Sequence, residues 1–243
     1  MSLARDAGVL WALLRGQPNA GSHAERLNGF YGPQAERYDH FRERLLHGRR
    51  ELLQELGSHL QSGDRLVELG AGTGRNLAFL EQRVDALGRV ELVDLCAPLL
   101  AQARKRWRGR NNVYAVEADA TGYRPSQPVD AVYMSYALTM VPDWFAAVDN
   151  ALAILRPGGV LGVVDFYVSR PNPVPGRVRH GGFTRHFWPL WFAHDGVHPN
   201  ADHLPYLESR CEVLSVSEQR APVPYLPGLK VPFYRFLGRK TAA

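Results

Sequence analysis

The chain has few cysteines and no long hydrophobic run, and these shortages exclude several classes of protein. Only Cys96 and Cys211 occur among 243 residues, too few for a disulfide framework or a cysteine-rich zinc site. No apolar stretch approaches the roughly 20 residues that a membrane-spanning helix needs. Gly8 to Leu14 is apolar but short, and Arg15 follows it instead of a small-residue cleavage site. We therefore expect a cytoplasmic protein whose N-terminal segment packs on the domain or touches lipid.

The chain has no large excess of positive or of negative charge. The formal net charge is +5, with 22% charged and 45% hydrophobic residues, which is ordinary for a globular protein. Such a balance favours an anionic surface without choosing between a phospholipid membrane and nucleic acid.

Strand-like runs alternate with helical patterns, which is typical of a parallel sheet covered by helices. The expected strands are Arg65–Leu69, Arg89–Val93, Asn112–Val116, Val129–Met134, Gly159–Phe166, Glu212–Ser217 and Val231–Leu237. The connection between the last two is too short for a parallel crossover, so they should pair antiparallel. The sequence thus predicts a doubly wound α/β fold with a seven-stranded, mostly parallel, Rossmann-like sheet that ends in an antiparallel hairpin. This layout is typical of methyltransferases rather than dehydrogenases.

Apolar residues at three- and four-residue spacing predict the helices. One long helix is expected from Ala35 to Leu56, and others carry Leu77–Val84, Leu99–Trp107 and Phe145–Leu155, the last capped by Asp143 and stopped at Pro157-Gly158-Gly159. Four regions follow from this pattern. They are an N-terminal helical cap (1–60), a cofactor-binding core (61–166), a substrate-facing insertion (167–210) and C-terminal strands that complete the sheet (211–243).

A glycine-rich turn directly follows the first expected strand, in the run from Val67 to Gly74. Glycine permits positive φ and lets a ligand approach the backbone, and the turn lies at the carboxyl ends of the strands, where open α/β sheets bind ligands. The residues expected to bind a cofactor here are Glu68, Gly70, Ala71, Gly72 and Gly74.

The spacing of this turn favours S-adenosylmethionine over a dinucleotide. The dinucleotide fingerprint G-x-G-x-x-G serves a pyrophosphate, whereas this turn reads G-x-G-x-G and is preceded by the acid Glu68. S-adenosylmethionine carries no phosphate, so an acid beside the turn is tolerated and can polarise it. An NAD-dependent oxidoreductase stays as an alternative, which equilibrium binding of the two cofactors would settle.

Polar residues also end the next three strands. Asp94 is placed to accept hydrogen bonds from both ribose hydroxyls, and Asp119 to accept one from the adenine amino group, although an acid at such a place also caps helices. The end of the fourth strand should face the methionine part of the cofactor. The expected cofactor-binding residues at these ends are Asp94, Leu95, Asp119, Ala120, Ser135 and Tyr136.

Further blocks resemble the N-methyltransferase component of betaine-lipid synthases. The runs from Tyr38 to Arg42 and from Leu46 to Arg49 are similar to that family's Y-D-x-x-R and L-x-G-R pattern, and Pro224–Gly228 is similar to a C-terminal block. The resemblance covers roughly residues 23 to 240. One departure is Phe233, where the family pattern has a second Tyr.

The resemblance implies three successive methylations of the amino group of diacylglyceryl-homoserine, each releasing S-adenosylhomocysteine. A lipid substrate implies peripheral contact with a membrane surface. It also implies functional pairing with the aminocarboxypropyl transferase of the same pathway, a domain that nothing in this chain resembles.

Several residues receive roles in this chemistry. Tyr38 and Tyr31 are expected to orient the amine, since an aromatic face suits the methylated cation. His194 is the candidate proton acceptor, with His186 and His198 as alternatives. A guanidinium fits a carboxylate bidentately, so we assign Arg49 to the cofactor and Arg42 to the substrate, with plain surface charge as the alternative. The remaining expected substrate-binding residues are His186, Trp188, Trp191, His198 and Tyr225.

Other interpretations of the insertion and of the activity stay open. Core packing is the alternative for the tryptophans. His194 and His198 lie one helical turn apart, but Pro199 follows and amine methylation needs no metal, so no metal site is expected. A methyltransferase for a soluble small amine or hydroxyl compound, and a non-catalytic cofactor-binding subunit, are the rival functions. Nucleic-acid methylation is disfavoured, because the end of the fourth strand lacks an Asn/Asp-Pro-Pro-aromatic run.

Overall fold

The computed structural model describes residues 22–31, 38–224 and 226–241, with only the backbone of His23, Phe30, Tyr31 and residues 38–41. The apolar segment from Gly8 to Leu14 lies outside this part of the chain. No helix among the described residues is long and apolar enough to cross a membrane.

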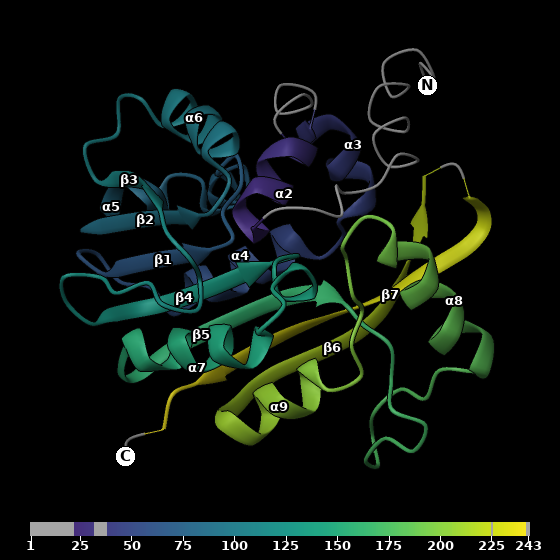
Figure 1. Cartoon of the computed structure of the whole chain (residues 1–243). Helices are drawn as coiled ribbons and strands as arrows, with labels where there is room; N and C mark the ends of the chain where they lie inside the picture. The colour runs from purple at the N-terminus through teal and green to yellow at the C-terminus, as the bar shows by residue number, and fades with distance from the viewer. Residues whose placement is uncertain (1–21, 32–37, 225, 242–243) are drawn as a thin grey trace.

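A seven-stranded sheet forms the centre of the molecule (Figure 1). Its strands are β1 (Arg65–Leu69), β2 (Arg89–Asp94), β3 (Val113–Glu117), β4 (Val129–Ser135), β5 (Leu155–Phe166), β6 (Glu212–Val223) and β7 (Leu226–Arg239). They lie in the order β3-β2-β1-β4-β5-β7-β6. The first five are parallel, and β7 pairs antiparallel with both β5 and β6. The predicted fold and the terminal hairpin are confirmed.

Successive side chains of the strands point to opposite faces of the sheet and pack into two hydrophobic cores, one on each face. On β1, Leu66 joins the core shared with α4 (Arg49–Ser58) and with η2 (Asn76–Leu80). Val67 joins the opposite core, which is shared with α7 (Trp144–Ile154) and α9 (His203–Arg210). The helices α5 (Arg83–Ala86) and α6 (Ala97–Arg106) complete the α4 face.

The single helix predicted from Ala35 to Leu56 is wrong within the described residues. The chain forms α3 (Tyr38–Leu45), breaks at Leu46–Gly48 and continues as α4. Gly48 has φ +80, and a Cβ there would come within 2.7 Å of the Phe233 ring. The break therefore lets the backbone pass against β7. A further helix, α2 (His23–Tyr31), precedes α3.

Two other predicted helix boundaries also differ. The pattern from Leu77 to Val84 divides into η2 and α5, because Glu81 takes φ 54°. The α7 helix starts at the predicted cap, where the Asp143 carboxylate accepts from the Ala146 N–H at 3.2 Å. It ends at Ile154, and Leu155 already belongs to β5, so this strand begins four residues earlier than Gly159.

The insertion between β5 and β6 carries α8 (Gly182–Ala193) and α9. Figure 1 shows α9 under the sheet and α8 at the far end of the β6–β7 hairpin. Both cysteines are buried and free.

Candidate active site

A cavity of about 280 Å³ lies at the carboxyl ends of β1, β2 and β4. Its wall is completed by α3, the α3–α4 junction and the segment after β4. Eleven of the predicted site residues line it: Arg42, Arg49, Gly70, Ala71, Gly72, Asp94, Leu95, Asp119, Ala120, Ser135 and Tyr136. The strand ends meet here because parallel strands place their carboxyl ends along one edge of the sheet.

The glycine turn forms the floor of this cavity. The N–H groups of Gly70 and Ala71 both donate to the Val93 carbonyl at 2.9 Å, which ties the turn to β2. Gly70 has φ +78, and a Cβ at this position would stand 2.4 Å from the Cβ of Ala137. Gly74 serves packing instead, since its missing Cβ leaves room for Leu92, and it does not line the cavity.

Asp94 is positioned by two backbone donors. Its Oδ2 accepts from the Gly72 N–H at 2.7 Å and its Oδ1 from the Cys96 N–H at 2.7 Å. Burial raises the pKa of this carboxyl, and these backbone donors oppose that rise. Each carboxylate oxygen accepts more than one hydrogen bond, so Asp94 keeps acceptor capacity for two adjacent hydroxyls.

A buried polar chain runs behind the turn. Glu68 accepts from the Asn76 amide at 2.7 Å and from the Tyr133 hydroxyl at 2.6 Å, and the Asn76 carbonyl accepts from Arg49 Nη1 at 3.0 Å. Burial raises the pKa of Glu68 to about 8, against the two donated hydrogen bonds. Glu68 thus lies behind the cavity wall rather than in it, and Asn76 connects it to the cavity.

Arg49 brings a buried positive charge to the cavity. Its guanidinium donates to Asn76 and to the Leu46 carbonyl at 2.9 Å, and burial lowers its pKa. The planar group has five N–H donors, so capacity remains for an anionic ligand. Arg42, half-buried on α3, lines the same wall.

The end of β4 presents Ser135 and Tyr136. The Ser135 hydroxyl is buried and finds no hydrogen-bond partner among the described residues, an arrangement that a bound polar ligand would satisfy. Tyr136 takes φ 54°, rare outside glycine, and its hydroxyl donates to the His47 carbonyl at 2.7 Å. Tyr136 therefore ties the floor of the cavity to the break between α3 and α4.

Asp119 lies exposed at the rim. Its Oδ1 accepts from the backbone N–H and the hydroxyl of Thr121, at 2.8 and 2.7 Å. The carboxylate is therefore fixed by a local turn rather than by a helix cap.

The predicted substrate residues of the insertion do not converge on the cavity. Four of them have exposed side chains: His186, Trp191, His194 and His198. Trp188 is instead buried in the core against Phe192. None of these residues lines the cavity. The side chains of Tyr31 and Tyr38, and Tyr225 as a whole, lie outside the described part of the chain. Within the described residues, no group of three or more His, Cys, Asp or Glu is placed to hold a metal ion.

Sequence reasoning missed part of the cavity wall. Pro142 and Asp143 line it although they were interpreted only as a helix start, and Asn76, two residues past the glycine turn, was not singled out. Asn76 could have been predicted, because it is a polar residue at the start of the segment that follows the glycine turn. The positions of Leu27 on α2 and of Met140 in the cavity wall could not be predicted, because nothing in the neighbouring sequence distinguishes them from core residues.

The cavity's donor set fits S-adenosylmethionine. Gly70 has no room for a side chain, Asp94 offers a carboxylate for ribose hydroxyls, and Arg49 offers a buried cation for an amino-acid carboxylate. The unsatisfied Ser135 hydroxyl lies on the same wall.

Comparison with known proteins agrees with this geometry. Residues 66–159 match the family described as "Methyltransferase domain". Trans-aconitate 2-methyltransferase of Escherichia coli O157:H7 is 31% identical over 104 residues, which are 43% of this chain and 40% of that protein. The ubiquinone/menaquinone biosynthesis C-methyltransferase UbiE of Serratia proteamaculans is 30% identical over 136 residues, 54% of this chain and 53% of that one. The chain therefore spans about half, or less, of the length of these relatives.

Among solved structures, the N-methyltransferase NodS from Bradyrhizobium japonicum WM9 in complex with S-adenosyl-l-homocysteine superposes with a TM-score of 0.66. The match is 14% identical and covers 89% of this chain and 99% of that one. Residues 66–159 thus match a methyltransferase domain, and the chain has the fold of a solved N-methyltransferase that holds S-adenosyl-l-homocysteine.

Proposed function

We propose that the chain is an S-adenosylmethionine-dependent N-methyltransferase that trimethylates the amino group of diacylglyceryl-homoserine. One observation carries the proposal. The N-terminal block that resembles betaine-lipid N-methyltransferases folds onto the cofactor cavity, where Arg42 and Arg49 line the same wall as Gly72 and Asp94. Two arginines of the block that resembles this family thus lie next to the glycine turn, a motif generic to methyltransferases.

Four contacts would hold the cofactor. Asp94 would accept from the ribose hydroxyls, Asp119 from the adenine amino group, and Arg49 would pair with the methionine carboxylate while Ser135 faces the same end. When bound, S-adenosylmethionine supplies a methyl group on a positively charged sulfur.

The second arginine suits the substrate head group. Arg42 would pair with the homoserine carboxylate in a fork-like arrangement, which leaves the amine free to turn toward the cofactor. Holding two reactants in line supplies much of the rate of such a transfer. Tyr38 and Tyr31 are proposed to orient the nitrogen, and their aromatic faces would favour the cation that accumulates.

Each transfer forms one carbon–nitrogen bond and breaks one carbon–sulfur bond, whose electron pair stays on sulfur, while one proton leaves the nitrogen. His194 stays the proposed proton acceptor. It follows α8 directly, and its neighbour Asp195 interacts electrostatically with both His194 and Arg42. Burial raises the pKa of Asp195 to about 6, and its electrostatic interactions with His194 and Arg42 oppose that rise.

The proposal is tested by mass spectrometry of the chain incubated with S-adenosylmethionine and diacylglyceryl-homoserine in mixed micelles. We expect mass gains of one, two and three methyl groups, all abolished by Asp94→Ala. No gain on this lipid, with cofactor binding intact, would refute the substrate and keep the cofactor.

A second candidate is methylation of a soluble small amine or hydroxyl compound. The matched relative whose name is trans-aconitate 2-methyltransferase favours a soluble small-molecule acceptor, although trans-aconitate itself is a carboxylate. Activity on a soluble acceptor that does not depend on micelles or vesicles would support this candidate. Under the lipid proposal the chain works as a peripheral protein at a membrane surface, paired in its pathway with an aminocarboxypropyl transferase.

A further inference from the structure

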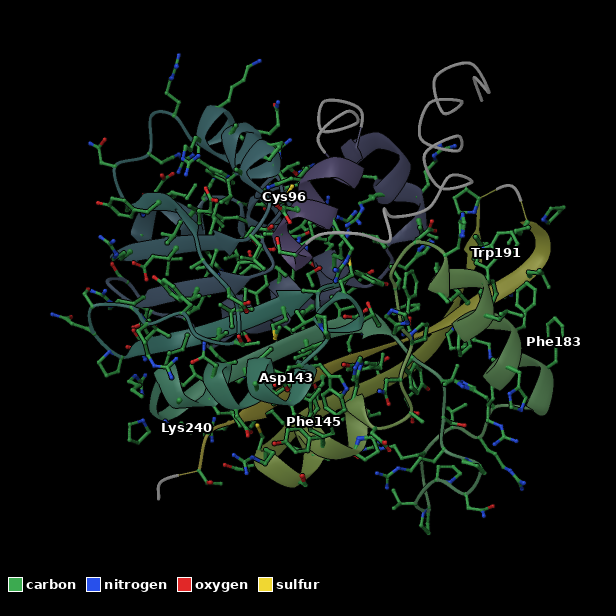
Figure 2. The ribbon with its side chains drawn as sticks, viewed as in Figure 1. Cys96, Asp143, Phe145, Phe183, Trp191 and Lys240 are labelled. Carbon is green, nitrogen blue, oxygen red and sulfur yellow. The ribbon has the colours of Figure 1, made fainter. Side chains whose placement is uncertain are left out.

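The outer side of α8 exposes large apolar side chains. Phe183, Leu190 and Trp191 are 64%, 79% and 47% exposed, at spacings of seven and eight residues that place them on one side of a helix. Phe187, between them in sequence, stacks on Phe183 at 4.9 Å and on Trp191 at 5.8 Å between ring centroids. Figure 2 shows Phe183 at the outer edge of this helix, away from the sheet. We call Phe183, Phe187, Leu190 and Trp191 the outer stripe.

The opposite side of the same helix already has its partner. Trp188 and Phe192 are buried in the core that also holds Ala221 and Val231 of the β6–β7 hairpin. Phe187 also packs against this core. The exposed side chains of Phe183, Leu190 and Trp191 are therefore additional to the packing that fixes α8. A helix that is apolar on both sides requires a second apolar environment, and of the described elements none covers this side in Figure 1.

The charged residues of α8 and of the segment that precedes it are all basic. The helix itself contains no Asp or Glu. Arg179 precedes it and Lys230 lies on the adjacent hairpin, both exposed, and neither forms an ion pair with a carboxylate in the described part of the chain. By contrast, Arg177 is paired with Glu208. The unpaired cations beside an apolar stripe complement a surface that is apolar inside and anionic at its boundary.

The turn after α8 is fixed to the cavity. The His198 N–H donates to the Thr139 carbonyl at 2.7 Å, and Thr139 belongs to η3 (Leu138–Met140), between Ala137 and Met140 of the cavity lining. A surface bound by α8 would thus be held at a defined position relative to the cavity.

We propose that the outer stripe, with Arg179 and Lys230, docks the protein on a phospholipid bilayer that contains anionic lipid. The stripe enters the boundary between head groups and acyl chains, where Trp and Phe are favoured, and the two cations contact lipid phosphates. The inference rests on the proposed lipid substrate for its biological sense, but the docking itself is a property of this surface.

Co-sedimentation of the full chain with vesicles tests the docking. We expect binding to phosphatidylcholine vesicles that contain phosphatidylglycerol, weaker binding to phosphatidylcholine alone, and loss of the difference at high salt. The variant Phe183→Ser/Leu190→Ser should reduce partitioning by about tenfold or more, because it removes the apolar area that lipid covers. Arg179→Gln/Lys230→Gln should reduce binding to the anionic vesicles only.

Tyr114→Ser/Val213→Ser is the matched control, since it removes two exposed apolar side chains from β3 and β6, away from α8. Equal S-adenosylhomocysteine binding by all variants establishes that they fold. Failure of the parent chain to bind either vesicle, or equal loss in the control, overturns the docking. A concentration-dependent dimer that only Phe183→Ser/Leu190→Ser abolishes, without vesicle binding, would also overturn it and assign the stripe to a second copy.

The outcome is separable from the proposed function. Vesicle binding without methylation of diacylglyceryl-homoserine would refute the substrate and leave the docking. Methylation in micelles without vesicle binding would support the substrate and refute the docking.

Discussion

The cofactor cavity and the insertion that carries α8 are held together by different forces. On the cofactor side, hydrogen bonds of 2.6 to 3.0 Å hold Asp94, Glu68 and Arg49, each by at least two partners. On the insertion side, α8 is held by stacked rings and leaves several of them exposed. The first arrangement has one geometry and tolerates little change, because each buried polar group depends on its partner. The second tolerates exchange of its outer residues, so it is the side free to adapt to a surface or substrate.

The strongest test of the cofactor side is Asp94→Ala. The change leaves the N–H groups of Gly72 and Cys96 without their acceptor and removes the ribose contact. We expect affinity for S-adenosylhomocysteine, measured by calorimetry, to fall roughly a thousandfold, about 4 kcal/mol. Asp119→Ala, at the exposed rim, should lose about tenfold. Equal losses for the two variants would contradict the difference between a buried and a rim contact.

The next largest effect is expected at Gly70. Gly70→Ala introduces a clash with Ala137 as well as strain at φ +78, and we expect a loss of about 3 kcal/mol in the free energy of unfolding. Gly63 is a matched control, because it has φ +87 but nothing within 4 Å of the added Cβ. Gly63→Ala should cost about 1 kcal/mol. Denaturant titrations measure both, and a similar cost for the two would show that space at the turn is unimportant.

A pH series tests the buried carboxyl behind the turn. The folded pKa of Glu68 is about 8, above its ordinary 4.5, so the unfolded chain releases this proton first. Its contribution to stability is complete below about pH 4.5 and is lost as pH rises toward 8. We expect Glu68→Gln to reduce the loss of unfolding free energy across this window by roughly 2 kcal/mol.

Asp165 provides the comparison for that series. Its pKa is raised by burial to about 7, against hydrogen bonds from Thr139 and Phe166. Asp165→Asn should therefore flatten the profile only up to about pH 7. A Glu68→Gln profile parallel to that of the parent chain would show that Glu68 ionises at an ordinary pH.

The smallest effect is expected on the outer side of α8. Phe183→Ser/Leu190→Ser should change the free energy of unfolding by less than about 0.5 kcal/mol, because both side chains are largely exposed. A marked loss of stability would mean that the outer stripe supports the fold, and the contrast between the two sides would disappear.

The residues that meet at the ends of the strands could be predicted from the sequence far better than the sides of a helix that face the core. Once the strand order is that of a doubly wound sheet, residues such as Asp94 and Ser135 must meet at one edge, and they do. The orientation of α8 could not be predicted in this way, because aromatic residues occupy both of its sides. Trp188 therefore proved to be core, whereas Trp191 is exposed.

The break between α3 and α4 could not be predicted from the neighbouring sequence either, because it depends on a contact with a distant strand. Periodicity continues through Leu45 and Leu52, and only the approach of Phe233 from a distant strand requires Gly48 at positive φ. Arg49 lines the cavity, and its hydrogen bond to Asn76 depends on that break.

The sheet ends in two unlike edges, and both resist further strand pairing. β3 has only five residues, and β6 is interrupted by a bulge near Val213 and Ser215 and ends in Pro222-Val223, with Glu218 and Arg220 along its length. Short, bulged, charged and proline-containing edges discourage chains from joining edge to edge. The tendency of this protein to aggregate should therefore be concentrated on α8, and detergent should suppress it more effectively than any change to the sheet.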